Sequence, residues 1–170
     1  MNRTSEDHLY WVERLQMEPH PEGGFYKETY RSDETIAAKA LPSRFGGNRS
    51  FGTAIYFMLT ADNFSAFHRI QSDETWHFYT GQSLTVFMIY PSGEYEEIHL
   101  GNNPEKGEVF QATVPAGVWF ASRLTQPQGW CLVGCTVAPG FDFADFTMAD
   151  RDELSQEFPQ HREIIRALTR

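Results

Sequence analysis

The feature that most constrains the fold of this chain is an alternation of apolar and polar side chains between residues 25 and 137. A period of two places successive side chains on opposite faces of a strand, whereas a helix repeats about every 3.6 residues. Turn residues (Gly, Pro, Asn, Asp and Ser) separate short apolar runs, as is typical of a sandwich or barrel. The predicted strands span residues 25–31, 50–59, 64–70, 75–80, 83–90, 95–100, 109–114, 118–124 and 130–137.

Helical patterns flank these strands. Residues 4–17 are predicted to form a helix, because Thr4 and Asp7 have the spacing of a capping box and apolar residues then recur at helical spacing. Asp150 begins another capping signature, and we expect two short helices between this residue and the last residues of the sequence. Residues 32–48 are predicted to form a long loop over the barrel.

The length of 170 residues fits one domain with a core of its own. We divide it into an N-terminal helix (1–20), a barrel (21–146) and C-terminal helices (147–170). The net charge of −9 argues against nucleic acid as a partner, because an acidic surface repels phosphate. The sequence shows neither a signal peptide nor a membrane-spanning run, so we expect a cytoplasmic protein.

Residues 64–81 place polar groups among apolar ones on two successive strands. Strand alternation puts His68 on the same face as Ala66 and Ile70, so the imidazole is predicted to point into the barrel. Glu74 shares a face with Trp76 and Phe78 on the next strand. An inward imidazole beside an inward carboxylate predicts a polar site in an apolar cavity. A structural, hydrogen-bonded histidine is the alternative.

This arrangement resembles the cupin superfamily. The first cupin motif contains His-x-His, then Glu and Gly at set spacings, and the second contains Pro-x-Gly followed by His. Ile70 and Phe120 stand where two of the motif histidines would be. The positions that match are His68, Glu74, Gly81 and residues 115–117.

Four longer blocks are similar to a small single-domain cupin subfamily of unknown function: residues 20–32, 72–81, 114–123 and 137–146. The resemblance implies an all-β, cupin-type jelly-roll barrel with short N- and C-terminal helices, and a homodimer. Its nearest functional analogy is to epimerases of the dTDP-4-dehydrorhamnose type, which use a cupin barrel without a metal. The implied partner is therefore a small molecule, such as a sugar or a nucleotide sugar.

The metal-binding capacity of this site is limited. A mononuclear centre needs three or four protein ligands, and only His68 and Glu74 stand at motif positions. We therefore expect no cofactor. The alternative is one divalent ion on these two residues with a further ligand from Gln111, His99 or Tyr56.

Without a metal, His68 suits general base catalysis at neutral pH. Glu74 or Asp142 is expected to orient its ring, and Tyr56 to return a proton on the other face. Tyr79 is a weaker candidate, because alternation places it outward. Removal and return of a proton beside a carbonyl is epimerisation or isomerisation. The alternatives are a metal-dependent cupin (a dioxygenase or isomerase) and a non-catalytic ligand-binding barrel.

Two groups of residues are predicted to bind the substrate. Lys27 and Arg31, on one face of a strand, are candidates for an anionic substrate group, with surface charge as the alternative. The glycines after Glu22 fit a tight turn better than a phosphate-binding loop. The remaining binding candidates are Gln111 and three aromatic residues that alternatively are plain core, Trp76, Phe78 and Phe120.

Overall fold

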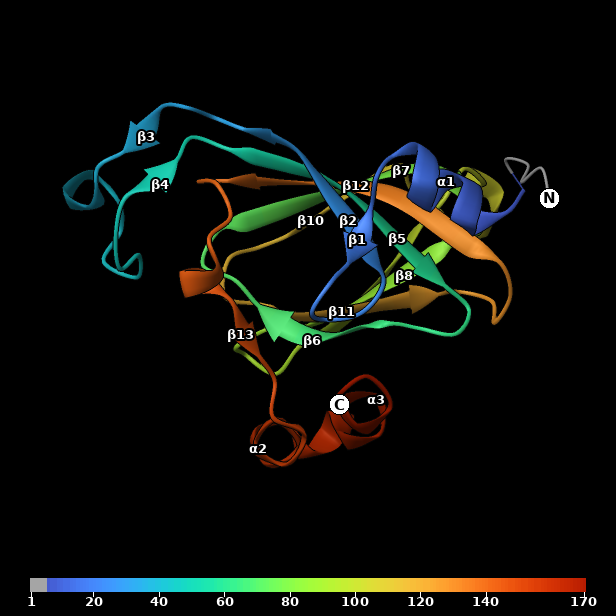
Figure 1. The fold of residues 1–170 in the computed structure, drawn as a ribbon. Coiled ribbons are helices and arrows are strands. Elements are labelled where there is room, and N and C mark those ends of the chain that lie inside the picture. The colour runs from blue at the N-terminus through green and yellow to red at the C-terminus, as the bar shows by residue number, and fades with distance from the viewer. Residues whose placement is uncertain (1–5) are drawn as a thin grey trace.

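Two facing antiparallel sheets form the barrel in a computed structural model that describes residues 6–170 (Figure 1). Among these residues the first sheet has six strands, in the order β1 (Glu18–Pro19), β2 (Phe25–Arg31), β5 (Thr53–Thr60), β12 (Trp130–Ala138), β7 (Asp73–Gly81) and β10 (Gln111–Val114). The second has five: β13 (Thr147–Met148), β6 (Ser65–Arg69), β11 (Trp119–Leu124), β8 (Leu84–Ile89) and β9 (Tyr95–Leu100). The predicted jelly-roll barrel is thereby confirmed.

The N-terminal helix is shorter than predicted. It is α1 (His8–Arg14), and its N-cap is Asp7, whose carboxylate accepts a hydrogen bond from the Leu9 N–H at 2.9 Å. Thr4, the expected cap, lies outside the described residues. Apolar residues of α1 pack on the outer face of the six-stranded sheet, against Met58 and Leu132. No helix in residues 6–170 is long and apolar enough to cross a membrane.

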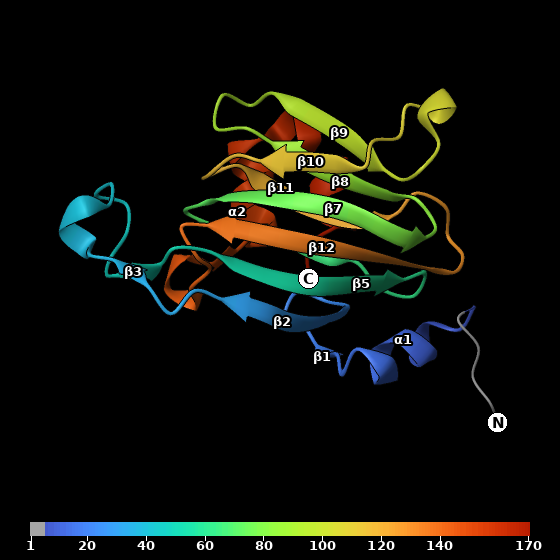
Figure 2. The same cartoon turned by 90° about the horizontal axis from the view of Figure 1, so that it is seen from above.

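The segment predicted as a loop over the barrel instead extends away from it (Figure 2). It contains the strand β3 (Thr35–Ile36) and the 3-10 helix η1 (Ala38–Ala40), and β3 pairs with β4 (Arg49–Ser50). Another 3-10 helix, η2 (Pro104–Lys106), follows β9.

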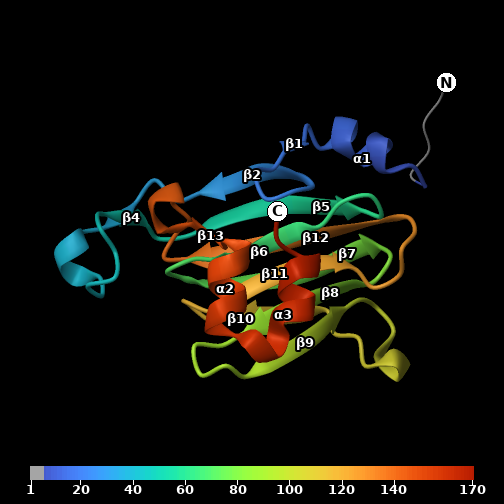
Figure 3. The same ribbon diagram turned by 90° about the horizontal axis from the view of Figure 1, so that it is seen from below.

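The C-terminal helices cover the outer face of the five-stranded sheet (Figure 3). They are α2 (Arg151–Glu157) and α3 (Arg162–Ala167), joined by the 3-10 helix η4 (Pro159–His161). As predicted, Asp150 caps α2: its carboxylate accepts hydrogen bonds from two backbone N–H groups at 2.9 Å. The barrel extends past the expected limit of residue 146, because β13 pairs with β6.

A buried ion pair ties β4 to the 3-10 helix η3 (Phe143–Asp145) beside the barrel. Arg49 donates two hydrogen bonds to the Asp145 carboxylate, from Nε at 2.7 Å and from Nη2 at 2.6 Å. Each side chain is only 5% exposed. The charges are thus removed from water, and each depends on the other for compensation.

Asp145→Asn is therefore expected to destabilise the protein by about 3–5 kcal/mol, because it leaves a buried guanidinium without its anion. Glu28→Gln is the matched control: it breaks the same kind of two-bond pair, to Arg31, at a site where the side chains are about 40% exposed. That change should cost at most about 1 kcal/mol. Urea denaturation measures both, and equal losses would contradict the assigned role of burial.

Candidate functional site

A cavity of about 480 Å³ lies between the two sheets. Its lining comes from the β1–β2 segment, from strands β5, β6, β7 and β12, and from residues 141–146. Half of its ionisable side chains are carboxyl groups, and they share the cavity with two histidines, a cysteine, a tyrosine, an arginine and several apolar residues. The polar lining residues are Glu18, His20, Glu22, Tyr26, Glu28, Arg31, Thr53, His68, Glu74, Cys135 and Asp142.

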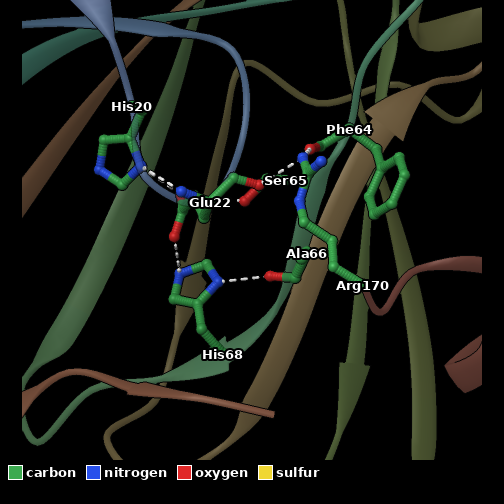
Figure 4. Close-up of polar contacts among 7 residues, drawn as sticks. All are labelled: His20, Glu22, Phe64, Ser65, Ala66, His68 and Arg170. Carbon is green, nitrogen blue, oxygen red and sulfur yellow. Dashed lines mark hydrogen bonds and ion pairs between the residues drawn. The ribbon is translucent and has the colours of Figure 1, made fainter. Parts of the chain in front are cut away.

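His68 and Glu22 approach each other closely in this cavity (Figure 4). His68 Nδ1 lies 2.7 Å from the Ala66 carbonyl oxygen. A carbonyl can only accept, so Nδ1 carries a hydrogen and donates it. His68 Nε2 lies 3.0 Å from Glu22 Oε2. Glu22 Oε2 has no hydrogen-bond partner in the part of the chain that the structure describes, so the two groups are in close contact without a hydrogen bond.

Burial decides where this proton resides. Glu22 and His68 are 5% and 3% exposed. Burial raises the pKa of Glu22 well above its usual value, and the nearby Glu74 carboxylate raises it further. Burial also lowers the pKa of His68 to about 3. Burial thus favours the uncharged form of each group.

The turn after β1 holds Glu22 in place. Gly23 and Gly24 have φ of +117° and +80°, a region that favours glycine, and a Cβ on Gly23 would lie 2.1 Å from the Phe64 carbonyl oxygen. Ser65 Oγ donates to Glu22 Oε1 at 2.9 Å. The guanidinium of Arg170 donates to the Glu22 carbonyl at 3.0 Å. The glycines thus serve a tight turn, and the turn delivers a carboxyl group to His68.

Glu74 lines the same cavity from the sheet opposite to His68. It lies on β7 of the six-stranded sheet, whereas His68 lies on β6 of the five-stranded sheet. Glu74 is 8% exposed. Burial raises its pKa to about 7, and a hydrogen bond from the Cys135 thiol offsets part of that shift. Glu74 therefore exchanges a proton near neutral pH.

The predicted orientation of His68 by Glu74 or Asp142 is wrong, because Ala66 and Glu22 already occupy both ring nitrogens. Asp142 does line the cavity, but its carboxylate accepts a hydrogen bond from the Ala144 N–H at 2.8 Å and caps η3. Sequence reasoning missed Glu22 as a site residue. The one available signal was its position beside Gly23-Gly24 in a block shared with the subfamily.

Lys27, Tyr56 and Gln111 do not line the cavity, contrary to prediction. Tyr56 pairs with Lys27 across β2 and β5, and its ring packs with an outer-face cluster that includes Met58. Gln111 is exposed, and its amide donates to His77 Nδ1 at 3.1 Å. Tyr56 therefore cannot return a proton inside the cavity.

A β-bulge between Glu28 and Tyr30 explains why Lys27 and Arg31 do not share a face. The bulge shifts the alternation by one residue. Arg31 lines the cavity, whereas Lys27 lies on the outer face.

The predicted aromatic wall is core instead. Trp76 and Phe120 are each 1% exposed, and Trp76 packs edge-on against Phe120 and Phe57. Phe78 packs against the same cluster. The Phe120 ring lies 4.1 Å from the His68 ring, behind the cavity lining. The aromatic residues that do line the cavity are Tyr26, Phe141, Phe143 and Phe146.

The residues present do not fit a metal centre. Among residues 6–170, no group of three or more His, Cys, Asp and Glu side chains is arranged to hold an ion. The proposed additional ligands do not reach the cavity: Gln111 and Tyr56 lie outside it, and His99 bonds to Thr85 at 3.0 Å on the other sheet. We derive no catalytic step through a metal, and operation without a cofactor stays a prediction.

Glu74→Gln is expected to make the free energy of unfolding fall less with rising pH than it does in the wild-type protein. Between the ordinary Glu pKa and about 7, folded Glu74 holds a proton that the unfolded chain releases. Wild-type stability therefore falls as pH rises through that window, by about 3 kcal/mol from this group. Glutamine does not titrate, so the variant should lose this part of the slope.

Urea denaturation at about pH 4.5 and about pH 8 tests this difference. Glu157→Gln, at an exposed position of α2, is the control and should follow the wild-type curve. Parallel pH curves for wild type and Glu74→Gln would contradict the burial of a titrating carboxyl group.

Comparisons with known proteins agree with this architecture. The chain is 34% identical over 149 residues to an uncharacterized protein of Saccharomyces cerevisiae, covering 82% of this chain and 74% of that one. An X-ray structure of a Shewanella oneidensis protein superposes with a TM-score of 0.86 at 38% identity and covers 99% of both chains. For a hypothetical protein from Leishmania major the values are 0.87 and 34%, with 98% of this chain and 99% of that chain covered.

More distant structures share the fold alone. Oxalate decarboxylase from Bacillus subtilis superposes with a TM-score of 0.54 at 13% identity, over 88% of this chain and 36% of the enzyme. The family model described as Cupin superfamily (DUF985) matches residues 9–149, which is most of the chain. With a jelly-roll barrel and an interior polar site, this chain belongs to that DUF985 family of the cupin superfamily.

Proposed function

We propose that this cupin is an isomerase or epimerase that moves a proton on a small carbonyl compound without a metal. The observation that carries the proposal is the close contact of Glu22 with His68 in a cavity that His68 and Glu74 line from opposite sheets. A ligand in the cavity would thus have a proton-exchanging group on each side. The homodimer and the cytoplasmic location remain predictions.

The proposed step uses Glu74 as the base. Its carboxylate takes the hydrogen from the carbon beside the carbonyl, and the carbonyl oxygen receives the electron pair as an enolate. The Glu22–His68 pair then delivers its proton to the opposite face of the same carbon, and the carbonyl re-forms. Glu74 ends protonated and the pair ends deprotonated, so the charge balances. Proton exchange with solvent, or turnover in the reverse direction, restores the starting state.

Two physical properties favour this chemistry. General acid–base groups are most effective when their pKa lies near the working pH, and burial raises the pKa of Glu74 to about 7. The neutral Glu22–His68 pair holds its proton at no cost in net charge, so it can release or accept it as the ligand changes charge. Each such group typically contributes about 10²–10⁴-fold in rate.

Hydrogen exchange with solvent tests the proposal. Wild-type protein is incubated in D₂O with a panel of aldoses, ketoses and their amino derivatives, and ¹H NMR follows the loss of the C–H signal beside the carbonyl. Glu22→Gln is expected to slow exchange by about 100-fold or more. The fold should survive, because glutamine has the shape of a neutral glutamic acid and its amide oxygen can still accept the hydrogen bond from Ser65.

Glu157→Gln makes the same chemical change on α2, away from the cavity, and should exchange at the wild-type rate. Undiminished exchange in Glu22→Gln would refute the assigned role of the pair. Binding of a panel compound without any exchange would favour a non-catalytic ligand-binding barrel.

Chelation distinguishes the metal-dependent alternative. Because His68 Nδ1 donates to Ala66 and Nε2 lies 3.0 Å from Glu22, exchange should be unaffected by excess EDTA. Loss of exchange on chelation, with recovery on addition of one divalent metal, would establish a metal-dependent cupin instead.

A further inference from the structure

We propose that the ligand of this cavity is an amine-bearing small molecule that binds as a cation, and that phosphorylated and nucleotide-linked compounds are excluded. The proposal deepens the proposed function by naming its substrate class, and it rests on that function only in using the same cavity.

The charges that line the cavity are mostly negative. Among residues 6–170, five carboxyl side chains line it, and Arg31 is its one lysine or arginine. The carboxyl groups come from the entrance as well as the interior: Glu18, Glu28 and Asp142 are exposed, whereas Glu22 and Glu74 are buried. An anion entering this cavity would meet repulsion from Glu18 and Asp142 at the entrance, and from Glu74 inside once that group is ionised.

Arg31 does not offset this excess, because its guanidinium is already engaged. Nε and Nη2 donate to the two oxygens of Glu28 at 2.9 Å and 2.8 Å, and Nη1 donates to the Phe141 carbonyl at 3.0 Å. A guanidinium that already donates two hydrogen bonds to one carboxylate has few N–H donors left for a phosphate. Lys27, the other candidate anion-binding residue, lies on the outer face of the sheet.

The two cavity histidines do not supply positive charge either. Burial lowers the pKa of His20 to about 4 and that of His68 to about 3, so both rings are neutral at physiological pH. His20 Nδ1 moreover accepts a hydrogen bond from the Glu22 N–H at 3.2 Å. The cavity therefore has no charged donor ready for an anionic ligand among the described residues.

The surroundings of Glu74 indicate which kind of ligand group would bind there. More than nine-tenths of it is buried, it lines the cavity, and the donor assigned to its carboxylate is the Cys135 thiol. A thiol is a weak donor, and a buried carboxylate needs strong ones. An ammonium group supplies several charge-assisted hydrogen bonds at once.

Aromatic rings on the same cavity complement a cation as well. Phe141 and Phe143 pack edge-to-face with centroids 4.9 Å apart, and Phe146 lies 6.4 Å and 6.0 Å from them. Phe143 is 54% exposed, so its ring is available to an entering ligand. The faces of aromatic rings attract ammonium groups, and carboxylates beside them add to that attraction.

Three ring compounds of similar size test the charge preference directly: cyclohexylammonium, cyclohexanol and cyclohexanecarboxylate. Their binding to the wild-type protein is measured by ligand-observed NMR at about pH 8, where Glu74 is ionised. The cation is expected to bind at least about tenfold more tightly than the alcohol. The carboxylate should bind more weakly than the alcohol.

Variants locate the preference within the cavity. Glu74→Gln should reduce cyclohexylammonium binding by about tenfold while cyclohexanol binding changes little. Asp142→Asn, which retains the cap on η3, should reduce it by about threefold. Glu157→Gln is the matched control and should bind as wild type does.

If cyclohexylammonium binds no more tightly than cyclohexanol, or if the carboxylate binds best, the proposal is wrong. These measurements involve no turnover, so their failure leaves the proton-transfer function standing. Conversely, absence of deuterium exchange leaves the charge preference intact.

Discussion

One buried contact organises the interior of this barrel: the 3.0 Å approach of a carboxyl oxygen of Glu22 to the imidazole of His68. The opposite ring nitrogen donates to the Ala66 carbonyl, which has no proton of its own to give. The neutral ring therefore turns its unprotonated nitrogen toward Glu22. Burial favours the uncharged form of both, so a single mobile proton is kept inside the protein at little electrostatic cost.

The jelly-roll topology makes this contact useful. Strands β6 and β7 follow one another in the chain but belong to different sheets, so His68 and Glu74 face the cavity from opposite walls although few residues separate them. Glu22 arrives from a third direction, on the turn between β1 and β2. The glycines of that turn permit its close approach to the Phe64 carbonyl. The glycine turn thus both avoids a clash with the Phe64 carbonyl and places the Glu22 carboxyl group in the cavity.

Most of the fold could be predicted from the sequence, because the alternation of apolar residues is local information. It identified the strands well, and the bounds of β2 and β9 agree with prediction. The functional site was harder to predict from the sequence. Glu22 meets His68 only through the packing of distant segments, which no spacing rule reports. A bulge after Glu28 reversed the alternation, so Lys27 and Arg31 were placed on one face when they lie on two.

That bulge also shows why a similar fold does not imply a similar ligand. An anionic sugar nucleotide needs cationic side chains that face the interior. Here the strand register places Lys27 on the outer face of the sheet. It places Arg31 on the inner face, but there the guanidinium is paired with Glu28. A barrel of the same topology can therefore have the opposite charge preference after a single inserted residue. Relatives that share the fold at low identity inform the architecture, whereas ligand charge depends on the few side chains that the strand register turns inward.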